Sequence, residues 1–183
     1  PLGAWTDDTA MALCLAESLL ERDGFDARDQ IERYTRWQRE GYLSATGRCI
    51  GVTRSTSRAL GFAQWRRQVF AGSHDPLQLD PEPLSRIAPV VMYFFSSPAQ
   101  VLEFAADASR VTCQAPMVLD ACRLFSAILL EALAGGSKAR ILNPPGFVAG
   151  AAPNPRIRYL LQGGYRKRRP EQIRAGSTVG EAL

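Results

Sequence analysis

Apolar residues recur at helical spacing along much of the chain and predict a mostly helical protein. The inward positions of the first such stretch, residues 8–21, are Met11, Cys14, Leu15, Ser18 and Leu19. They follow the i, i+3, i+4, i+7, i+8 pattern of a helix with one buried face, and Gly24 can end that helix in a left-handed conformation. The same periodicity predicts helices over residues 27–39, 55–64, 84–95, 99–108, 115–134 and 157–162, and a further helix is beginning in the last residues, 175–183.

Glycine, proline and hydroxyl residues separate the predicted helices. Residues 41–54 read as a long polar connection, and residues 71–83 contain three prolines, which excludes a helix interior there. Neither a repeat nor a convincing hairpin is present in the sequence. The pattern therefore predicts a compact all-α fold formed by one domain, residues 1–183, with Trp5, Trp37 and Trp65 as packing residues.

Composition and charge narrow the class of protein. The chain is 46% hydrophobic with a net charge of +4, and no apolar run reaches the roughly 20 residues of a membrane span. We therefore expect a cytoplasmic protein without a membrane partner. The basic run Tyr165–Arg174 is more typical of a solvated surface than of a nucleic-acid site, so no nucleic-acid partner is predicted.

The cysteines and the histidine do not form a metal motif. Cys14, Cys49, Cys113 and Cys122 include no CxxC pair, and the single histidine, His74, is distant from them in sequence. This spacing argues against a zinc site. Cys14 and Cys122 fall on apolar helical faces, where cysteine is usually a small core residue.

A short acidic motif at the start of the first helix is open to two interpretations. Thr6, Asp7 and Asp8 could cap the helix, because their oxygens accept hydrogen bonds from free amides and their charge offsets the helix dipole. The same three residues also place hydroxyl and carboxylate oxygens within one turn, and these are the ligands that Mg²⁺ prefers. On spacing alone, capping is favoured, although one set of oxygens could serve both roles.

The stretch WTDDTAMALCLAESLLE, residues 5–21, resembles the N-terminal signature of the ADP-ribosylglycohydrolases. Further similar segments follow in the family's order over residues 33–60, 83–94, 108–133 and 163–183. The resemblance implies an orthogonal helical bundle, here incomplete at both ends. It implies a hydrolase that removes ADP-ribose from modified protein side chains or cleaves related glycosidic links to ADP-ribose. It also implies one or two Mg²⁺ ions, with Thr6, Asp7 and Asp8 as ligands, and an ADP-ribosylated protein or small molecule as partner.

Several positions depart from the family's pattern. Gly51 stands where many relatives carry an aspartate, Asp80–Glu82 replaces a Gly-Asn-Gly turn, and Cys113 replaces a histidine after Thr112. A second acidic motif expected near the C-terminus does not occur before Leu183. A pseudoenzyme or binding scaffold is therefore the alternative function.

Catalytic and substrate-binding residues are not identified by the sequence. In the loop before the third predicted helix, Arg54 and Ser55 could contact phosphate, although solvent exposure is the expected fate of Arg54.

Overall fold

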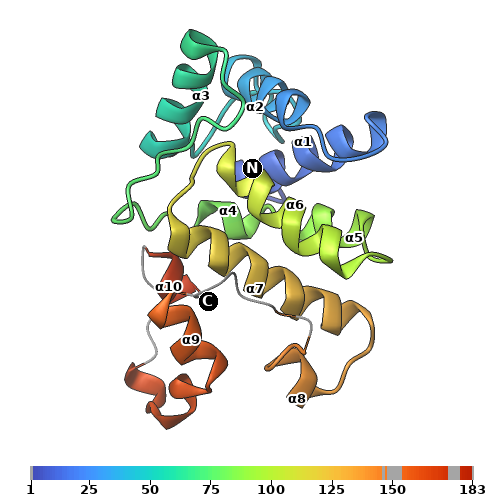
Figure 1. Cartoon of the computed structure of the whole chain (residues 1–183). Helices are drawn as coiled ribbons and strands as arrows, with labels where there is room; N and C mark the ends of the chain where they lie inside the picture. Colours follow the sequence, from blue (N-terminus) through green and yellow to red (C-terminus); the bar gives the residue numbers. More distant parts are fainter. Residues whose placement is uncertain (1, 146, 148–153, 173–177, 183) are drawn as a thin grey trace.

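The computed structural model describes residues 2–145, 147, 154–172 and 178–182 (Figure 1). Its α-helices are α1 (Asp7–Glu21), α2 (Ala27–Glu40), α3 (Arg54–Arg66), α4 (Glu82–Ser85), α5 (Ala88–Tyr93), α6 (Pro98–Arg110), α7 (Pro116–Leu133), α8 (Lys138–Ile141), α9 (Pro155–Leu161) and α10 (Val179–Ala182). Two 3₁₀ turns, η1 (Gly164–Lys167) and η2 (Pro170–Gln172), follow α9. Within these ranges there is no β-strand, only an isolated bridge between Ser73 and Cys113, so the all-α prediction is confirmed.

Most predicted helices are present within one or two residues of their expected bounds. One exception is the segment 84–95, which forms two short helices, α4 and α5, instead of one. Pro89 lies in the first turn of α5, where its missing N–H interrupts no helical hydrogen bond. The four-residue helix α8 was not predicted, because so short an element has no periodicity to detect. Of the helix predicted over residues 175–183, the structure describes α10, Val179–Ala182, whereas residues 175–177 and 183 lie outside the described residues.

Capping residues define the ends of α2 and α3, and with them the ends of the loop 41–53 that connects these helices. Asp26 caps α2 by accepting hydrogen bonds from two backbone amides, and Thr53 caps α3 in the same way through the amide of Thr56. Gly41 ends α2 with φ of 71°, and a Cβ there would lie 2.3 Å from the Gly47 carbonyl carbon. Only glycine therefore allows the loop 41–53 to fold back this closely.

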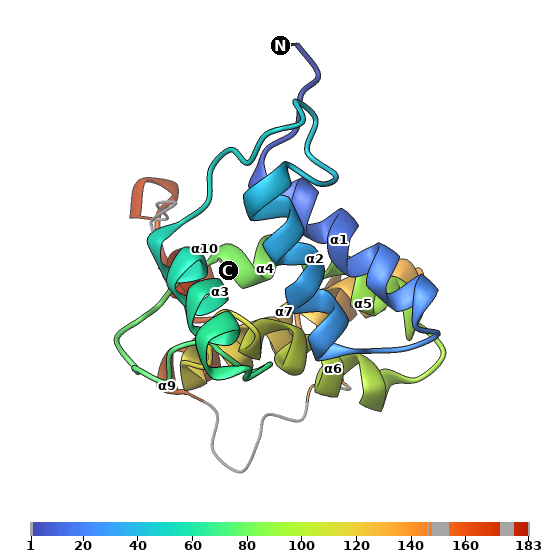
Figure 2. The same cartoon turned by 90° about the horizontal axis from the view of Figure 1, so that it is seen from above.

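Two apolar clusters share helix α1. Met11 and Cys14 pack with α2 and α3 around Tyr34, Trp37 and Leu60. One turn further on, Leu15 and Leu19 pack instead with the larger cluster formed by α5, α6 and α7. In Figures 1 and 2, α1 accordingly lies between α2 and α5, while α6 runs beside α7. The core positions predicted for Cys14 and Cys122 are confirmed, since both side chains are fully buried.

The tryptophan predictions are confirmed in one case and wrong in two. Trp37 is fully buried, but Trp5 is 40% exposed and Trp65 is 71% exposed. The indole of Trp5 lies over the returning loop and donates a hydrogen bond to the Leu43 carbonyl at 3.0 Å. An indole N–H that finds a partner at the surface can remain there at little cost.

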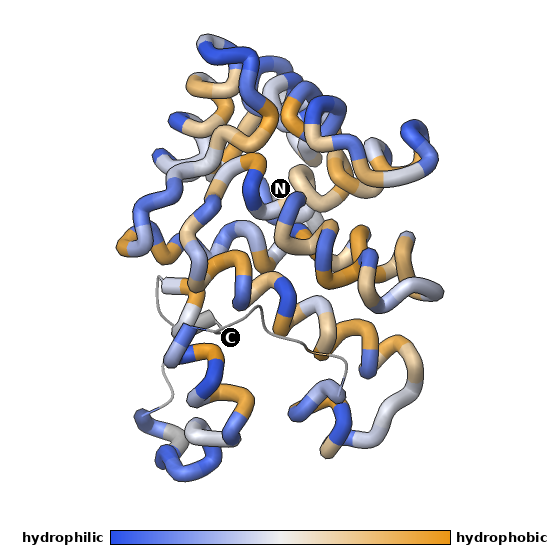
Figure 3. The backbone as a smooth tube through the Cα atoms, viewed as in Figure 1, coloured by the Kyte–Doolittle hydropathy of each residue, from blue (hydrophilic) through white to orange (hydrophobic). Residues whose placement is uncertain are grey.

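The surface can be compared with two features noted in the sequence, the absence of a long apolar run and the basic run near the C-terminus. None of the described helices is long and apolar enough to cross a bilayer. Figure 3 shows hydrophobic and hydrophilic positions alternating along α7, as expected for a helix with one buried side. The basic side chains at positions 166–169 are exposed, whereas residues 173 and 174 of the predicted basic run lie outside the described residues.

Candidate functional site

The motif Thr6–Asp8 lies at the beginning of α1. Thr6 occupies the N-cap position with an extended backbone, φ −103° and ψ −161°, but its side chain accepts no hydrogen bond from the first turn. The prediction that its hydroxyl caps the helix is therefore wrong. Asp7 and Asp8 still stand in the first turn, where their charge is favourable to the helix dipole. The hydroxyl of Thr6 is therefore not engaged in capping the helix.

Asp7 is half-buried against the loop that contains Gly51. A Cβ at position 51 would lie 2.4 Å from Oδ1 of Asp7, and the backbone of Gly51 has φ of +87°. Both observations favour glycine, because L-residues rarely adopt this φ and no side chain fits beside the carboxylate. The structure thus gives a physical reason for glycine at this position of the chain.

Replacing Gly51 by alanine is expected to lower the free energy of unfolding by about 1–3 kcal/mol and to displace the Asp7 carboxylate. Gly61, in the exposed middle of α3, is the matched control, because an added Cβ there would have no atom within 4 Å. Gly61→Ala should raise stability by about 0.5–1 kcal/mol, because alanine is the better helix former. Chemical denaturation measures both variants, and equal effects would contradict the role assigned to Gly51.

Asp8 is linked to helix α4 through Ser85. The Ser85 hydroxyl lies 2.6 Å from Oδ1 of Asp8 and 2.8 Å from the carbonyl oxygen of Glu82. A hydroxyl has one proton to donate, and a carboxylate is the stronger acceptor. Ser85 therefore holds one oxygen of Asp8 in place and leaves the other oxygen free of this contact.

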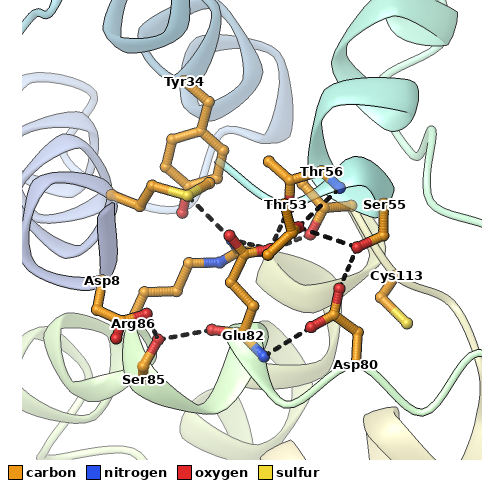
Figure 4. Close-up of polar contacts among 12 residues, drawn as sticks. Asp8, Tyr34, Thr53, Ser55, Thr56, Asp80, Glu82, Ser85, Arg86 and Cys113 are labelled. Carbon is orange, nitrogen blue, oxygen red and sulfur yellow. Dashed lines mark hydrogen bonds and ion pairs between the residues drawn. The ribbon is translucent and has the colours of Figure 1, made fainter. Parts of the chain in front are cut away.

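The turn before α4 is held by hydroxyl groups from the start of α3 (Figure 4). Ser55 donates to the carboxylate of Asp80, and Asp80 also accepts the amide of Glu82 at 3.0 Å. Thr53 and Thr56 both donate to Oε2 of Glu82, the former at 2.9 Å. The acidic side chains that replace the expected glycine turn are thus engaged in bonds within the protein.

Behind this turn lies a buried ion pair. The Arg86 guanidinium is 3.9 Å from Oε2 of Glu82, and the two side chains are 1% and 5% exposed. Burial raises the pKa of the Glu82 carboxyl, against the lowering effect of Arg86 and the two threonine hydroxyls. The second oxygen of Glu82, Oε1, is buried without a hydrogen-bond partner. The Glu82 carboxylate is therefore held through Oε2, which accepts the two threonine hydroxyls, and not through Oε1.

Arg86 joins four parts of the fold. Its guanidinium contacts Met11 Sδ at 3.3 Å, lies 5.2 Å from the centre of the Tyr34 ring, and donates to Thr112 Oγ1. The neighbouring Cys113 is buried and approaches the carbonyl of Gln78 at 3.7 Å. The Thr112–Cys113 pair noted in the sequence therefore belongs to this internal network.

The donor set at the start of α1 suits a hard cation. None of the ion pairs among the described residues involves Asp7 or Asp8, and every candidate donor is an oxygen. In the part of the chain that the structure describes, no three Asp, Glu, His or Cys side chains gather closely enough to hold a metal. The oxygens of Thr6, Asp7 and Asp8 are of the type that Mg²⁺ prefers, and two carboxylates with one hydroxyl would supply only part of its coordination shell.

Ser85 and Arg86, which support this motif, were not predicted from the sequence. The spacing of Glu82 and Arg86, four positions apart with opposite charge, is a usable signal for a helical ion pair. Ser85 has no such signal, because its contact with Asp8 joins residues 77 positions apart. The sequence suggested Arg54 and Ser55 as possible phosphate contacts. The structure bonds Ser55 to Asp80, and Arg54 is exposed, as expected.

Comparison with known proteins places these features in a family. The model of the ADP-ribosylglycohydrolase family matches residues 1–182. Two similar proteins are named ADP-ribosylarginine hydrolase Tri1: that of Pseudomonas putida (strain GB-1) is 32% identical over 183 residues, and that of Serratia proteamaculans (strain 568) is 29% identical over 182 residues. Each alignment covers 99% of this chain and 48% of the relative, so the chain spans about half the length of these proteins.

A solved structure extends the likeness to three dimensions. It is described as an ADP-ribosylglycohydrolase-related protein complex and superposes with a TM-score of 0.81 at 35% sequence identity. The match covers 99% of this chain and 57% of the other. With the family model matched over nearly every residue, the chain belongs to the ADP-ribosylglycohydrolase family.

Proposed function

We propose that this chain contributes to a magnesium-dependent hydrolase that removes ADP-ribose from modified arginine side chains. The observation that carries the proposal is the set of oxygens at the start of α1, where the Thr6 side chain caps nothing and Asp7 and Asp8 form no ion pair within the described residues. Family membership supports the hydrolysis of ADP-ribosyl links. The names of the two bacterial relatives support arginine as the modified residue.

Thr6, Asp7 and Asp8 would hold the metal. A bound Mg²⁺ would act as a Lewis acid and an orienting centre for oxygen atoms of the substrate. The surrounding residues supply position: Ser85 fixes one oxygen of Asp8, and Gly51 allows the loop to lie against Asp7. The Glu82–Arg86 pair anchors α4, and with it Ser85, to the helices behind the site.

The test is release of free ADP-ribose from a protein that carries ADP-ribosylarginine. The purified chain is incubated with this substrate in Mg²⁺ or in EDTA, and free ADP-ribose is separated chromatographically. We expect release in Mg²⁺ that falls to the background level in EDTA and returns when Mg²⁺ is restored. Release that is equal in EDTA would refute magnesium dependence, and no release under either condition would refute hydrolysis by this chain.

The second candidate function is a binding scaffold without turnover. It is favoured by the segment Asp80–Glu82, whose carboxylates are tied to hydroxyls of α3. Calorimetry with ADP-ribose, with and without Mg²⁺, separates the two functions. Binding of ADP-ribose combined with no release from the modified protein supports the scaffold, whereas release excludes it.

A further inference from the structure

A cavity of about 820 Å³ lies between α3 and the segment 68–78. Its wall is held firmly, because the Gln114 amide donates to the carbonyls of Phe70 and Gly72 at 3.1 and 2.9 Å. Gly72 lies so close to the next segment that a Cβ would be 2.3 Å from the Cys113 amide nitrogen. The volume is in the range of roughly 300–1,000 Å³ that is typical of ligand sites. It can therefore accept several side chains of a partner.

Two arginines on α3 give the cavity positive charge. Arg54 and Arg58 line it from consecutive turns of one helical face, and both are exposed. Neither belongs to an ion pair with any residue in the described ranges. The acidic side chain of the lining, Asp75, already accepts the amide of Leu77 at 2.9 Å. The two guanidinium groups are thus available to an anionic partner.

The remaining lining mixes polar side chains with apolar ones, and its large apolar members are Phe62, Phe70 and Leu77. Leu77 and Phe62 are 84% and 41% exposed, so both can be covered by apolar groups of a bound partner. Phe62 meets Trp65 edge to face, with ring centres 6.2 Å apart, and the Arg110 guanidinium covers Phe70 at 3.9 Å. These ring contacts favour aliphatic side chains over a nucleobase as the occupant.

The spacing of the arginines fits an extended acidic segment. Residues four positions apart on a helix have Cβ atoms about 5–6 Å apart. Alternate residues of an extended chain are separated by about 7 Å and point to the same side. Carboxylates at alternate positions can therefore each meet one guanidinium, while the apolar residues between them point away from α3, towards Leu77 in the facing segment.

We propose that this cavity binds an acidic, partly aliphatic segment of the protein whose ADP-ribosyl group is removed. This inference rests on the proposed function and names the kind of partner involved. Ser55 lines the cavity and bonds Asp80, and at the other end of the same segment Ser85 bonds Asp8. Figure 4 shows these two contacts on opposite sides of Glu82. The segment 80–85 thus connects one edge of the cavity to the acidic motif, and a protein substrate that occupies the cavity is the partner that we assign to it.

The test uses a fluorescein-labelled hexapeptide of alternating glutamate and leucine, with fluorescence anisotropy as readout and no Mg²⁺ present. The full chain should bind it, and the double variant R54E/R58E should bind it about 100-fold more weakly, roughly tenfold for each charge-assisted contact. The control R66E/R67E reverses two charges at the other end of α3, outside this lining. It should change affinity by less than about threefold, and circular dichroism checks that both variants remain helical.

Three outcomes would overturn the inference. One is an equal loss in both double variants, which would indicate only a general effect of charge. Another is equal binding of a hexapeptide of alternating lysine and leucine. The third is displacement of the acidic peptide by ADP-ribose, which would make the cavity a nucleotide site. Peptide binding without hydrolysis would count against the proposed function alone, and hydrolysis without peptide binding would count against this inference alone.

Discussion

Replacing Arg86 by alanine lowers the free energy of unfolding by about 3–5 kcal/mol, because the Glu82 carboxylate then remains buried without a counter-charge. The variant also loses the contacts of Arg86 with Met11, Tyr34 and Thr112. Urea unfolding followed by circular dichroism measures the change. A loss below about 1 kcal/mol would contradict the central position given to this side chain.

Two further variants separate the buried charge from the lost packing. Arg140 pairs with Glu131 at 2.9 Å on the surface, with 61% of its side chain exposed, so Arg140→Ala should have a much smaller effect. The double replacement Glu82→Gln with Arg86→Met removes both charges and keeps much of the volume. It should recover at least about half of the loss, because no unpaired charge remains buried when both members of the pair are replaced together.

The pH dependence of the alanine variant follows from the raised pKa of Glu82. A carboxyl whose pKa is higher in the folded state binds protons there before it does so in the unfolded chain, so its contribution to stability increases as the pH falls through the folded pKa. Arg86→Ala removes the cation that lowers this pKa. The destabilisation should therefore be smaller near about pH 5 than near about pH 8.

If the proposed function is correct, replacing Asp7 by alanine should reduce both metal affinity and the release of ADP-ribose by about 100-fold or more. Changes to residues that merely support metal ligands already cost about 10–100-fold, and Asp7 supplies one of the two carboxylates of the motif. Titration with Mn²⁺, followed by electron paramagnetic resonance, measures the affinity without requiring turnover. The fold should be retained, because the Asp7 side chain makes no ion pair with the described residues.

Asp26 provides the matched control for Asp7. It is also an acidic residue at a helix start, but its side chain caps α2 by accepting two backbone amides. Asp26→Ala should lower stability by about 0.5–2 kcal/mol and leave Mn²⁺ affinity unchanged. If instead Asp7→Ala bound Mn²⁺ as the unmodified chain does, the assignment of Asp7 as a ligand would be wrong.

The sequence predicted those parts of the fold that depend on local pattern. The long helices α1, α2, α6 and α7 follow from apolar periodicity, and Pro116 lies in the first turn of α7, where proline is readily accommodated. The division of 84–95 into α4 and α5 was not predicted, because the apolar periodicity of the segment does not mark the break between Ser85 and Ala88. The prediction of Trp5 as a packing residue was wrong, because the sequence does not indicate the hydrogen bond to the Leu43 carbonyl that holds its indole at the surface.

The candidate site was predictable only in its acidic motif. Thr6, Asp7 and Asp8 are adjacent in sequence and can be recognised together, and the magnesium role remains a prediction. The supporting contacts could not be predicted from the sequence, because Ser85 and Gly51 approach the motif from segments that are distant along the chain. From the sequence, Gly51 reads as the loss of an aspartate that many relatives carry. In the structure, the close approach of Asp7 leaves no room for a side chain at position 51.

The placement of α1 between two apolar clusters affects how the acidic motif responds to local unfolding. Met11 and Cys14 belong to one cluster, and Leu15 and Leu19 belong to the other. Detaching α1 would expose apolar surface in both clusters at once, so the amides in the buried middle of α1 should exchange with solvent only when the whole chain opens. The helix that carries Asp7 and Asp8 therefore stays attached to the core for as long as the chain is folded.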